Sequence, residues 1–178
     1  EANLATLAEG ETDFFLTYAH PFVPLLLDPE LFSWHVMGRD RVLPVAAPEL
    51  NMEGKGRCAG EGFLDLAVAS GMQAPYLDYG TASFFGTVLQ RIFYDHPGLD
   101  RHIVHRSAIC SGLRELALLG RGVCWLPEQL VRADLDKGTL VLAGAPQWTF
   151  EVEVRLYRLR AEQRRTLEQL WTGILQAQ

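Results

Sequence analysis

Histidines and cysteines are the residues of this sequence best suited to hold a metal or attack a substrate. The five histidines, at positions 20, 35, 96, 102 and 105, lack the i, i+4 spacing that places two ligands on one helix face. His102 and His105 lie three apart on a predicted strand or turn, so their side chains point to different faces. Cys58, Cys110 and Cys124 have no metal-like spacing either. We therefore expect no metal site and no cofactor.

Catalytic patterns are also missing from the sequence. Ser111 follows Cys110 on a predicted helix, whereas a nucleophilic serine of the G-x-S-x-G type sits on a strained strand-to-helix turn. Residues 54–62 hold four glycines, but without the Lys-Ser/Thr ending or the strand-to-helix context of a phosphate-binding loop. No pair of carboxylates stands out for acid–base work. We expect a protein that is not an enzyme.

The composition is that of a globular protein. The 178 residues are 48% hydrophobic and 21% charged, enough for one substantial core or two smaller ones. The longest apolar run, residues 21–27, is far shorter than the ~20 residues that span a bilayer, so no membrane partner is expected. A net charge of −6 with scattered arginines argues against DNA binding by this chain alone. Three cysteines, an odd and sparse count, favour a reducing, cytoplasmic location over a disulfide scaffold.

Strands alternate with helices along most of the chain, a pattern typical of a mostly parallel sheet covered by helices. Residues 32–37 and 42–47 predict two separate strands, and the glycine-rich stretch 51–62 predicts an exposed connection. Ser107 is a candidate N-cap for the helix that follows it. Charged residues alternate with Val152, Val154 and Leu156, which suits a strand at a sheet edge. The last helix is expected to bury Leu167, Leu170, Trp171 and Ile174.

One segment resembles a known family. Residues 113–127, LRELALLGRGVCWLP, resemble the helix, aliphatic-G-x-G-aliphatic strand and Leu-Pro of LysR-type effector-binding domains. Residues 7–16 resemble the family's L-x-x-G-x-x-D-aliphatic element, and residues 42–48 resemble its cross-over strand. These motifs follow the family's order over nearly the whole chain. The segments 79–86 and 125–128 are most similar to the hypochlorite-responsive branch, although Ile109 stands where a methionine switch would be expected.

The resemblance implies an α/β fold of two Rossmann-like lobes joined by two crossing strands, like a type 2 periplasmic binding protein. By comparison with the family pattern, we expect that its first strand, helix and strand and its DNA-binding head are not part of this sequence. Lobe I maps to residues 1–48 plus 143–178, and lobe II maps to residues 49–142. The family binds its effector between the lobes, where strand ends and helix N-termini converge.

The positions that we expect to contact the effector are Tyr18, His20, Tyr79, Gly80, Thr81, Ala82, Ser83, His105, Arg106 and Ser107. Two helix N-termini and Arg106 should make this region positive, which suits an anionic or acceptor-rich effector. Structural roles remain open for several of these residues. Ser83 and Ser107 could cap helices, and Tyr18 could belong to the core. His20 could be a surface loop residue, and Arg106 could lie on the surface without a ligand.

The implied function is effector sensing in a cytoplasmic transcription regulator. Its partners would be a small-molecule effector, a second copy of the chain through the helix at 84–94, with tetramers in the full-length protein, and promoter DNA through the missing winged helix-turn-helix. One alternative is an exported solute-binding protein of a transporter, and a second is an enzyme on the same fold. A third is an oxidant sensor that uses Met52, Met72, Cys58 or Cys110.

Overall fold

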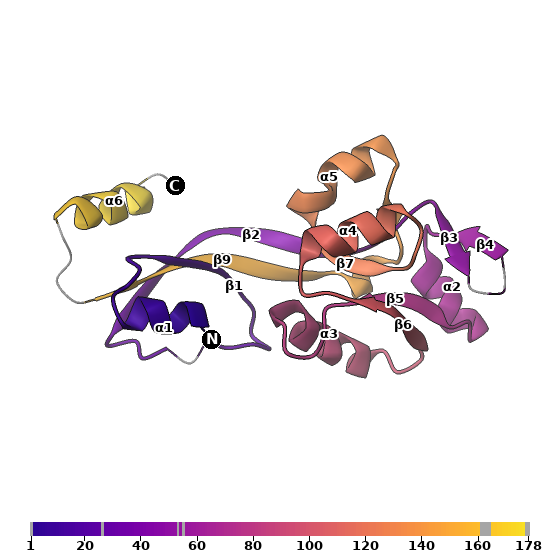
Figure 1. The fold of residues 1–178 in the computed structure, drawn as a ribbon, viewed down its shortest axis with the longest axis horizontal. Helices are drawn as coiled ribbons and strands as arrows, with labels where there is room; N and C mark the ends of the chain where they lie inside the picture. Colours follow the sequence, from indigo (N-terminus) through magenta and orange to yellow (C-terminus); the bar gives the residue numbers. More distant parts are fainter. Residues whose placement is uncertain (1, 26, 53, 55, 161–164, 177–178) are drawn as a thin grey trace. The chain divides into compact units, whose positions relative to one another are not determined.

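The computed structural model describes residues 2–25, 27–52, 54, 56–160 and 165–176. The chain forms two compact units, residues 1–39 with 153–178 (unit 1) and residues 40–152 (unit 2). Two long strands, β2 (Phe32–Ala46) and β9 (Phe150–Leu159), run through both units (Figure 1). The unit boundaries fall inside these strands, whereas the sequence predicted lobe boundaries at 48/49 and 142/143, beside Pro48 and at a strand end. Glu1 and Gln178, the ends of the predicted lobe I, lie outside the described residues.

Unit 1 holds α1 (Ala2–Ala8), β1 (Phe15–Ala19) and α6 (Arg165–Gln176) beside its parts of β2 and β9. β1 pairs antiparallel with β9, from Phe15 opposite Tyr157 to Ala19 opposite Glu153. Leu7 of α1 is fully buried against Phe32 and Tyr157. This small apolar cluster fixes α1 on one face of the strands.

The helix α6 is anchored in unit 1 through Trp171. Its ring stacks on Phe14 at a centroid distance of 6.1 Å, and the Arg158 guanidinium lies 4.6 Å from the ring centroid. Leu170 was predicted to be buried but is 53% exposed. The two neighbours differ because successive residues of a helix point about 100° apart, so the turn that seats Trp171 directs Leu170 outward.

Unit 2 contains the remaining elements, and their bounds follow in chain order. They are β3 (Glu49–Met52), β4 (Gly56–Ala59), α2 (Phe63–Ser70), β5 (Ala74–Asp78), α3 (Phe84–Asp95), β6 (Arg101–Arg106), α4 (Cys110–Leu118), β7 (Cys124–Pro127), α5 (Glu128–Lys137), β8 (Val141–Leu142) and a 3-10 turn (Pro146–Trp148). β5 and β6 pair in parallel, from Ala74 opposite Arg101 to Asp78 opposite Arg106. Their carboxyl ends therefore lie side by side, which brings together the loops that leave them.

Trp125 is the centre of the unit 2 core. It is fully buried, and the rings of Tyr76 and Phe93 meet it edge-on at centroid distances of 5.9 and 5.2 Å. Its indole N–H donates to the carbonyl of Trp148 at 2.7 Å, so the polar atom of this side chain is satisfied inside the core. The indole of Trp148 in turn donates to Asp65 at 2.9 Å.

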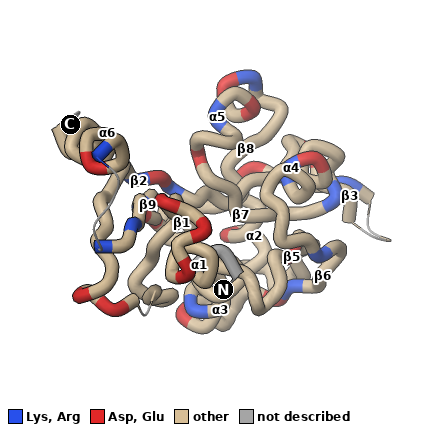
Figure 2. The backbone as a smooth tube through the Cα atoms, turned by 60° about the vertical axis from the view of Figure 1, so that its left-hand side comes forward, with Lys and Arg blue, Asp and Glu red and all other residues tan. Residues whose placement is uncertain are grey.

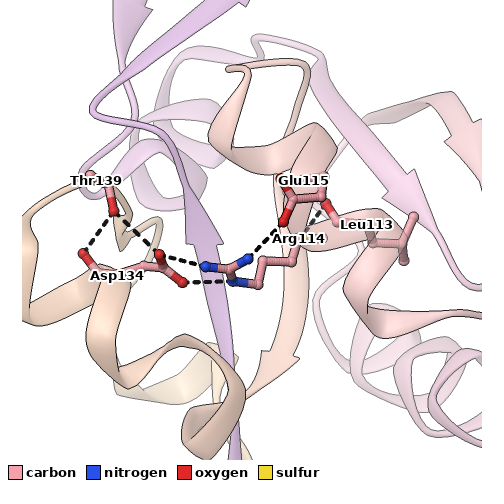
Figure 3. Close-up of polar contacts among 6 residues, drawn as sticks. Leu113, Arg114, Glu115, Asp134 and Thr139 are labelled. Atoms are coloured by element: carbon pink, nitrogen blue, oxygen red, sulfur yellow. Dashed lines mark hydrogen bonds and ion pairs between the residues drawn. The ribbon is translucent and has the colours of Figure 1, made fainter.

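An ion pair joins α4 to α5 (Figure 3). The Arg114 guanidinium donates to both oxygens of Asp134, each at 2.7 Å, and a third nitrogen donates to Glu115 at 2.7 Å. The Asp134 side chain is only 9% exposed, and that of Arg114 is 27% exposed. Two parallel charge-assisted hydrogen bonds of this kind fix both distance and orientation between the helices.

Several predicted strand features are wrong. The predicted strands 32–37 and 42–47 are one continuous strand, β2, because its charged residues 39–41 remain within the extended pairing. The stretch 51–62 is not simply a connection, since β3 and β4 form a hairpin from Glu49 opposite Ala59 to Met52 opposite Gly56. Leu50 and Met52 are buried, an alternation that the glycines masked.

The strand β9 does not lie at a sheet edge, as its charged alternation had suggested. The sheet order is β1-β9-β2-β7, with β8 pairing off this path to β2. Three charged residues of β9 form ion pairs: Arg155 contacts Glu153 at 2.6 Å, and Arg158 contacts Glu168 at 2.8 Å. The expectation of mostly parallel strands also fails here, since β1–β9, β2–β7 and β2–β8 are all antiparallel.

Candidate functional site

A hollow of about 490 Å³ lies within unit 2 at the carboxyl ends of β5 and β6. It is called the β5–β6 hollow below, and its lining residues are Tyr79, Gly80, Thr81, Ala82, Ser83, Arg106 and Ala108. The parallel register explains this grouping, because Asp78 and Arg106 end the two strands directly opposite each other. Six of the residues named from the sequence therefore line one hollow. Ala108 was not named, because an alanine carries no chemical signal of its own.

The loop from Gly80 to Ser83 folds back onto the first turn of α3. The Ser83 hydroxyl accepts a hydrogen bond from the amide of Gly86 at 3.0 Å and donates to the carbonyl of Gly80 at 3.0 Å. Gly80 has a φ of +77°, and a Cβ on Gly86 would lie 1.8 Å from the Gly80 carbonyl oxygen. Ser83 thus caps α3, the structural role left open by the sequence, while it also lines the hollow.

Arg106 is held at the hollow by an acidic partner. Its Nε donates to Oδ2 of Asp78 at 2.7 Å. The Asp78 side chain is 11% exposed and that of Arg106 is 60% exposed, so the guanidinium faces solvent from a buried anchor. Sequence reasoning missed Asp78, and only its register opposite Arg106 could have indicated it. The positive field expected from Arg106 is therefore offset by a neighbouring carboxylate.

The hydroxyl of Tyr79 is directed into the core. It donates to the carbonyl of Trp125 at 2.8 Å and lies 3.3 Å from Sγ of Cys110. Tyr79 is 2% exposed, and burial raises the pKa of its phenol well above the ordinary value. At neutral pH this side chain is a neutral donor that is already engaged by the core.

His105 and Ser107 flank Arg106 but are not among the lining residues. His105 is exposed and pairs with Leu77 in the sheet. The amide of Ser107 donates to the carbonyl of Asp78 at 2.9 Å, and its hydroxyl accepts from the amide of Ile109 at 3.2 Å. The prediction that Ser107 caps the next helix is wrong, because α4 begins at Cys110 with Ile109 as N-cap.

Tyr18 and His20 belong to unit 1, whereas the β5–β6 hollow lies within unit 2. Tyr18 is half-buried in β1 opposite Val154. Nδ1 of His20 accepts a hydrogen bond from the amide of Phe22 at 3.1 Å, and the two rings meet edge-on at a centroid distance of 4.8 Å. Partial burial lowers the pKa of the His20 imidazole below its ordinary value.

The thiols differ in their surroundings. Cys124 is fully buried, and this burial raises the pKa of its thiol. Cys58 and Cys110 are partly exposed. Among the described residues, no three metal-ligating side chains are grouped to hold an ion, and no helix is long and apolar enough to cross a membrane.

Helices α4 and α5 of unit 2 carry charges of both signs. Figure 2 shows acidic and basic residues together on α4 and α5. In α4 these are Arg114 and Glu115, and in α5 they include Glu128, Arg132 and Asp134. This mixture differs from the continuous basic face of a free-standing DNA-binding module.

Known proteins resemble this chain in both sequence and fold. The family model of the LysR substrate binding domain matches residues 1–178. The HTH domain-truncated transcriptional regulator QseD of Escherichia coli O157:H7 is 26% identical over 97 residues, which are 54% of this chain and 40% of QseD. The chain thus spans less than half the length of this curated relative.

Solved structures share the fold. The regulatory domain of HypT from Salmonella typhimurium, in its apo form, matches with a TM-score of 0.77 and 24% identity, over 98% of this chain and 76% of HypT's. Full-length HypT is described as a hypochlorite-specific LysR-type transcriptional regulator. DarR of Vibrio fischeri, solved in complex with DNA, matches with a TM-score of 0.74 and 21% identity, over 98% of this chain and 54% of DarR's.

The family match over residues 1–178 agrees with the structure. The chain has the order of elements of an α/β protein, and two long strands are shared by its two units. Such effector-binding domains are a family of regulator modules and not a family of enzymes. The chain belongs to the family of LysR substrate-binding domains.

Proposed function

We propose that this chain is the effector-sensing part of a LysR-type transcription regulator and that a small anionic or acceptor-rich molecule binds at the β5–β6 hollow. The observation that carries the proposal is the convergence of the Gly80–Ser83 loop, the start of α3 and Arg106 on one hollow of about 490 Å³. That volume falls within the roughly 300–1,000 Å³ common for small-molecule sites. The family match favours a regulator over an exported solute-binding protein.

Arg106 and the loop amides would supply the contacts with the effector. Asp78 accepts a hydrogen bond from Nε of Arg106, and the guanidinium has further N–H groups on a side chain that is 60% exposed. The first turn of α3 contributes the partial positive charge of a helix N-terminus. Asp78 weakens attraction to a bare anion, so recognition would depend on oriented hydrogen bonds more than on net charge.

Signal transmission would follow from differential affinity. An effector that binds one arrangement of the two units more tightly shifts the population toward it, and a difference of ~1–3 kcal/mol suffices for regulation. In the complete regulator, we propose that paired copies carry this change to winged helix-turn-helix heads on promoter DNA in the cytoplasm. Effector contacts by Tyr18 and His20 of unit 1 stay predictions that rest on the sequence alone.

Ala82→Asp tests the position of the site. Ala82 is exposed, lines the hollow and precedes the capping Ser83, so a carboxylate there adds negative charge without removing a capping bond. An acidic residue near a helix N-terminus also suits the helix dipole, so the melting temperature without ligand should change little. Affinity for the effector should fall at least about tenfold, which corresponds to about 1.4 kcal/mol.

The assay is thermal melting with and without sulfate, phosphate and a series of small carboxylates. Gln90→Glu, at an exposed position of α3 outside the hollow, is the charge-matched control and should bind like wild type. If no compound raises the melting temperature of the wild-type protein, the metabolite-sensing proposal fails. If Ala82→Asp binds as tightly as Gln90→Glu, the site lies elsewhere.

Oxidant sensing is the second candidate, and the likeness to HypT favours it. Met37 is 40% exposed, while Met52 is 8% exposed. Brief hypochlorite treatment followed by peptide mapping should therefore oxidise Met37 before Met52, with Cys58 and Cys110 ahead of the buried Cys124. A sensing role additionally requires that the oxidised form change its oligomeric state, and oxidation without such a change would reject this candidate.

A further inference from the structure

Unit 2 contains a second hollow, also of about 490 Å³, that no part of the proposed function uses. It lies against α5, with walls from β2, β8, the segment 144–149 and the start of β9, and it is called the α5 hollow below. Its floor and sides are apolar, formed by Leu43, Leu135, Leu142, Pro146 and Phe150. Leu43 and Phe150 are nearly fully buried, whereas Leu142 is 47% exposed. The hollow shares no lining residue with the β5–β6 hollow.

One end of the α5 hollow is charged, through Arg41, Glu128 and Glu151. Nε of Arg41 donates to Oε2 of Glu128 at 2.7 Å, and this contact lowers the pKa of the Glu128 carboxyl group. Arg41 also interacts with Glu151 through charge alone. Within the described part of the chain, the Glu151 carboxylate has no hydrogen bond and no ion pair within 4 Å.

The charges at this end select the sign of a ligand. Glu128 neutralises Arg41, so an incoming anion would have to break a 2.7 Å bond and then face the negative charge of Glu151. A cation meets the opposite situation, because Glu151 can accept its hydrogen bonds without losing an existing partner. An apolar body would cover Leu135 and Leu142, which are partly exposed, and remove their surface from water.

We propose that the α5 hollow binds a small amphipathic amine, with its ammonium group at Glu151 and its apolar body on Leu135 and Leu142. The two hollows share no lining residue, so binding in one requires no change in the other. The α5 hollow would take a cation and the β5–β6 hollow an anion. The domain would therefore respond to two different molecules. The response to two molecules rests on the proposed function, whereas the amine site in the α5 hollow does not depend on it.

Titration with 2-phenylethylamine, followed by amide resonances of the isotope-labelled domain, tests the proposal. The amine is protonated at pH 7, as alkyl amines are below a pKa near 10. The controls are 2-phenylethanol, which keeps the phenylethyl group but has no charge, and phenylacetate, which carries a negative charge in place of the positive one. We expect shifts for the amides of 149–151 and of Leu135, with binding in the order amine, alcohol, acid. The amine should bind roughly two- to fivefold more tightly than the alcohol, the usual gain from one exposed ion pair.

Two variants and one matched control identify the contacts. Glu151→Gln should weaken amine binding by the same roughly two- to fivefold and leave alcohol binding unchanged. Leu135→Lys, at a partly exposed position of α5, places a like charge over the floor and should abolish amine binding. Glu11→Gln, an exposed position in unit 1, removes an equal charge and should have no effect.

The proposal is overturned if the amine causes no shifts, if the shifts map outside the α5 hollow, or if alcohol and amine bind equally. It is also overturned if Glu151→Gln behaves like Glu11→Gln. Ala82→Asp should bind the amine like wild type, so failure of the anion site and failure of this site are distinguishable.

Discussion

Replacing Arg114 with methionine should destabilise unit 2 by about 3 kcal/mol, the lower end of the range for a buried ion pair that loses one partner. The variant keeps most of the apolar stem of Arg114 but leaves the Asp134 carboxylate, 9% exposed, without its two 2.7 Å donors (Figure 3). The lower end applies because the Arg114 side chain is 27% exposed, so water can reach part of the vacated space.

A double-mutant cycle separates the pair from its surroundings. Asp134→Asn should cost less, about 1–2 kcal/mol, because Arg114 retains its bond to Glu115 and its contact with water. The double variant should be more stable than the sum of the single changes by about 1–2 kcal/mol, since neither group is then left buried and unpaired. Urea unfolding followed by the fluorescence of Trp125 and Trp148, both buried in unit 2, measures each free energy.

The exposed pair of Arg91 and Asp95 on α3 is the matched control. Its atoms are 3.4 Å apart and its side chains are 54% and 47% exposed, so the same cycle should give about 0.5 kcal/mol or less. If the Arg114–Asp134 cycle is additive within about 0.5 kcal/mol, the reasoning that burial makes this pair strong is refuted.

Three further predictions concern association, pH and thiol reactivity. The domain should self-associate through α3, and Tyr94→Glu, at a position that is 75% exposed, should shift sedimentation toward monomer; identical profiles for both proteins would reject this interface. The pKa of His20 is lowered by burial, so between the folded and unfolded pKa values the unfolded chain binds more protons and the free energy of unfolding falls as pH drops below about 6.5. His20→Gln should flatten that part of the pH profile in urea titrations, and an unchanged slope would contradict it. A thiol reagent should label Cys58 and Cys110 in the native protein well before Cys124, whose thiol pKa is raised by burial; equal rates would contradict the burial of Cys124.

The sequence by itself determined most helices and strands, because their apolar periods and end signals are local. Gly71 ends α2 and Gly138 ends α5, both with positive φ, and a glycine directly after an apolar helical period is a local signal for such an end. The loop Gly80–Ser83 also followed from the sequence, since a strand of buried residues runs directly into it and the α3 stripe begins after it. The family resemblance rested on the same local motifs and their order.

Features that depend on pairing between distant residues required the tertiary structure. Charged residues 39–41 interrupt the apolar pattern of β2 in sequence, yet the strand continues because neighbouring strands satisfy its backbone. The hairpin of β3 and β4 was hidden for the same reason, since its alternation of buried and exposed residues has meaning only once a partner covers one face.

The tertiary structure also decided which charged residues meet at the two hollows. Asp78 and Arg106 are 28 residues apart, and Arg41 and Glu128 are 87 apart, so no spacing rule links either pair. Only the parallel register of β5 and β6 sets Asp78 beside Arg106, and that contact reduces the positive charge that the sequence assigned to the hollow. Coulomb energy depends on distance through space and on burial, and neither quantity is a function of separation along the chain.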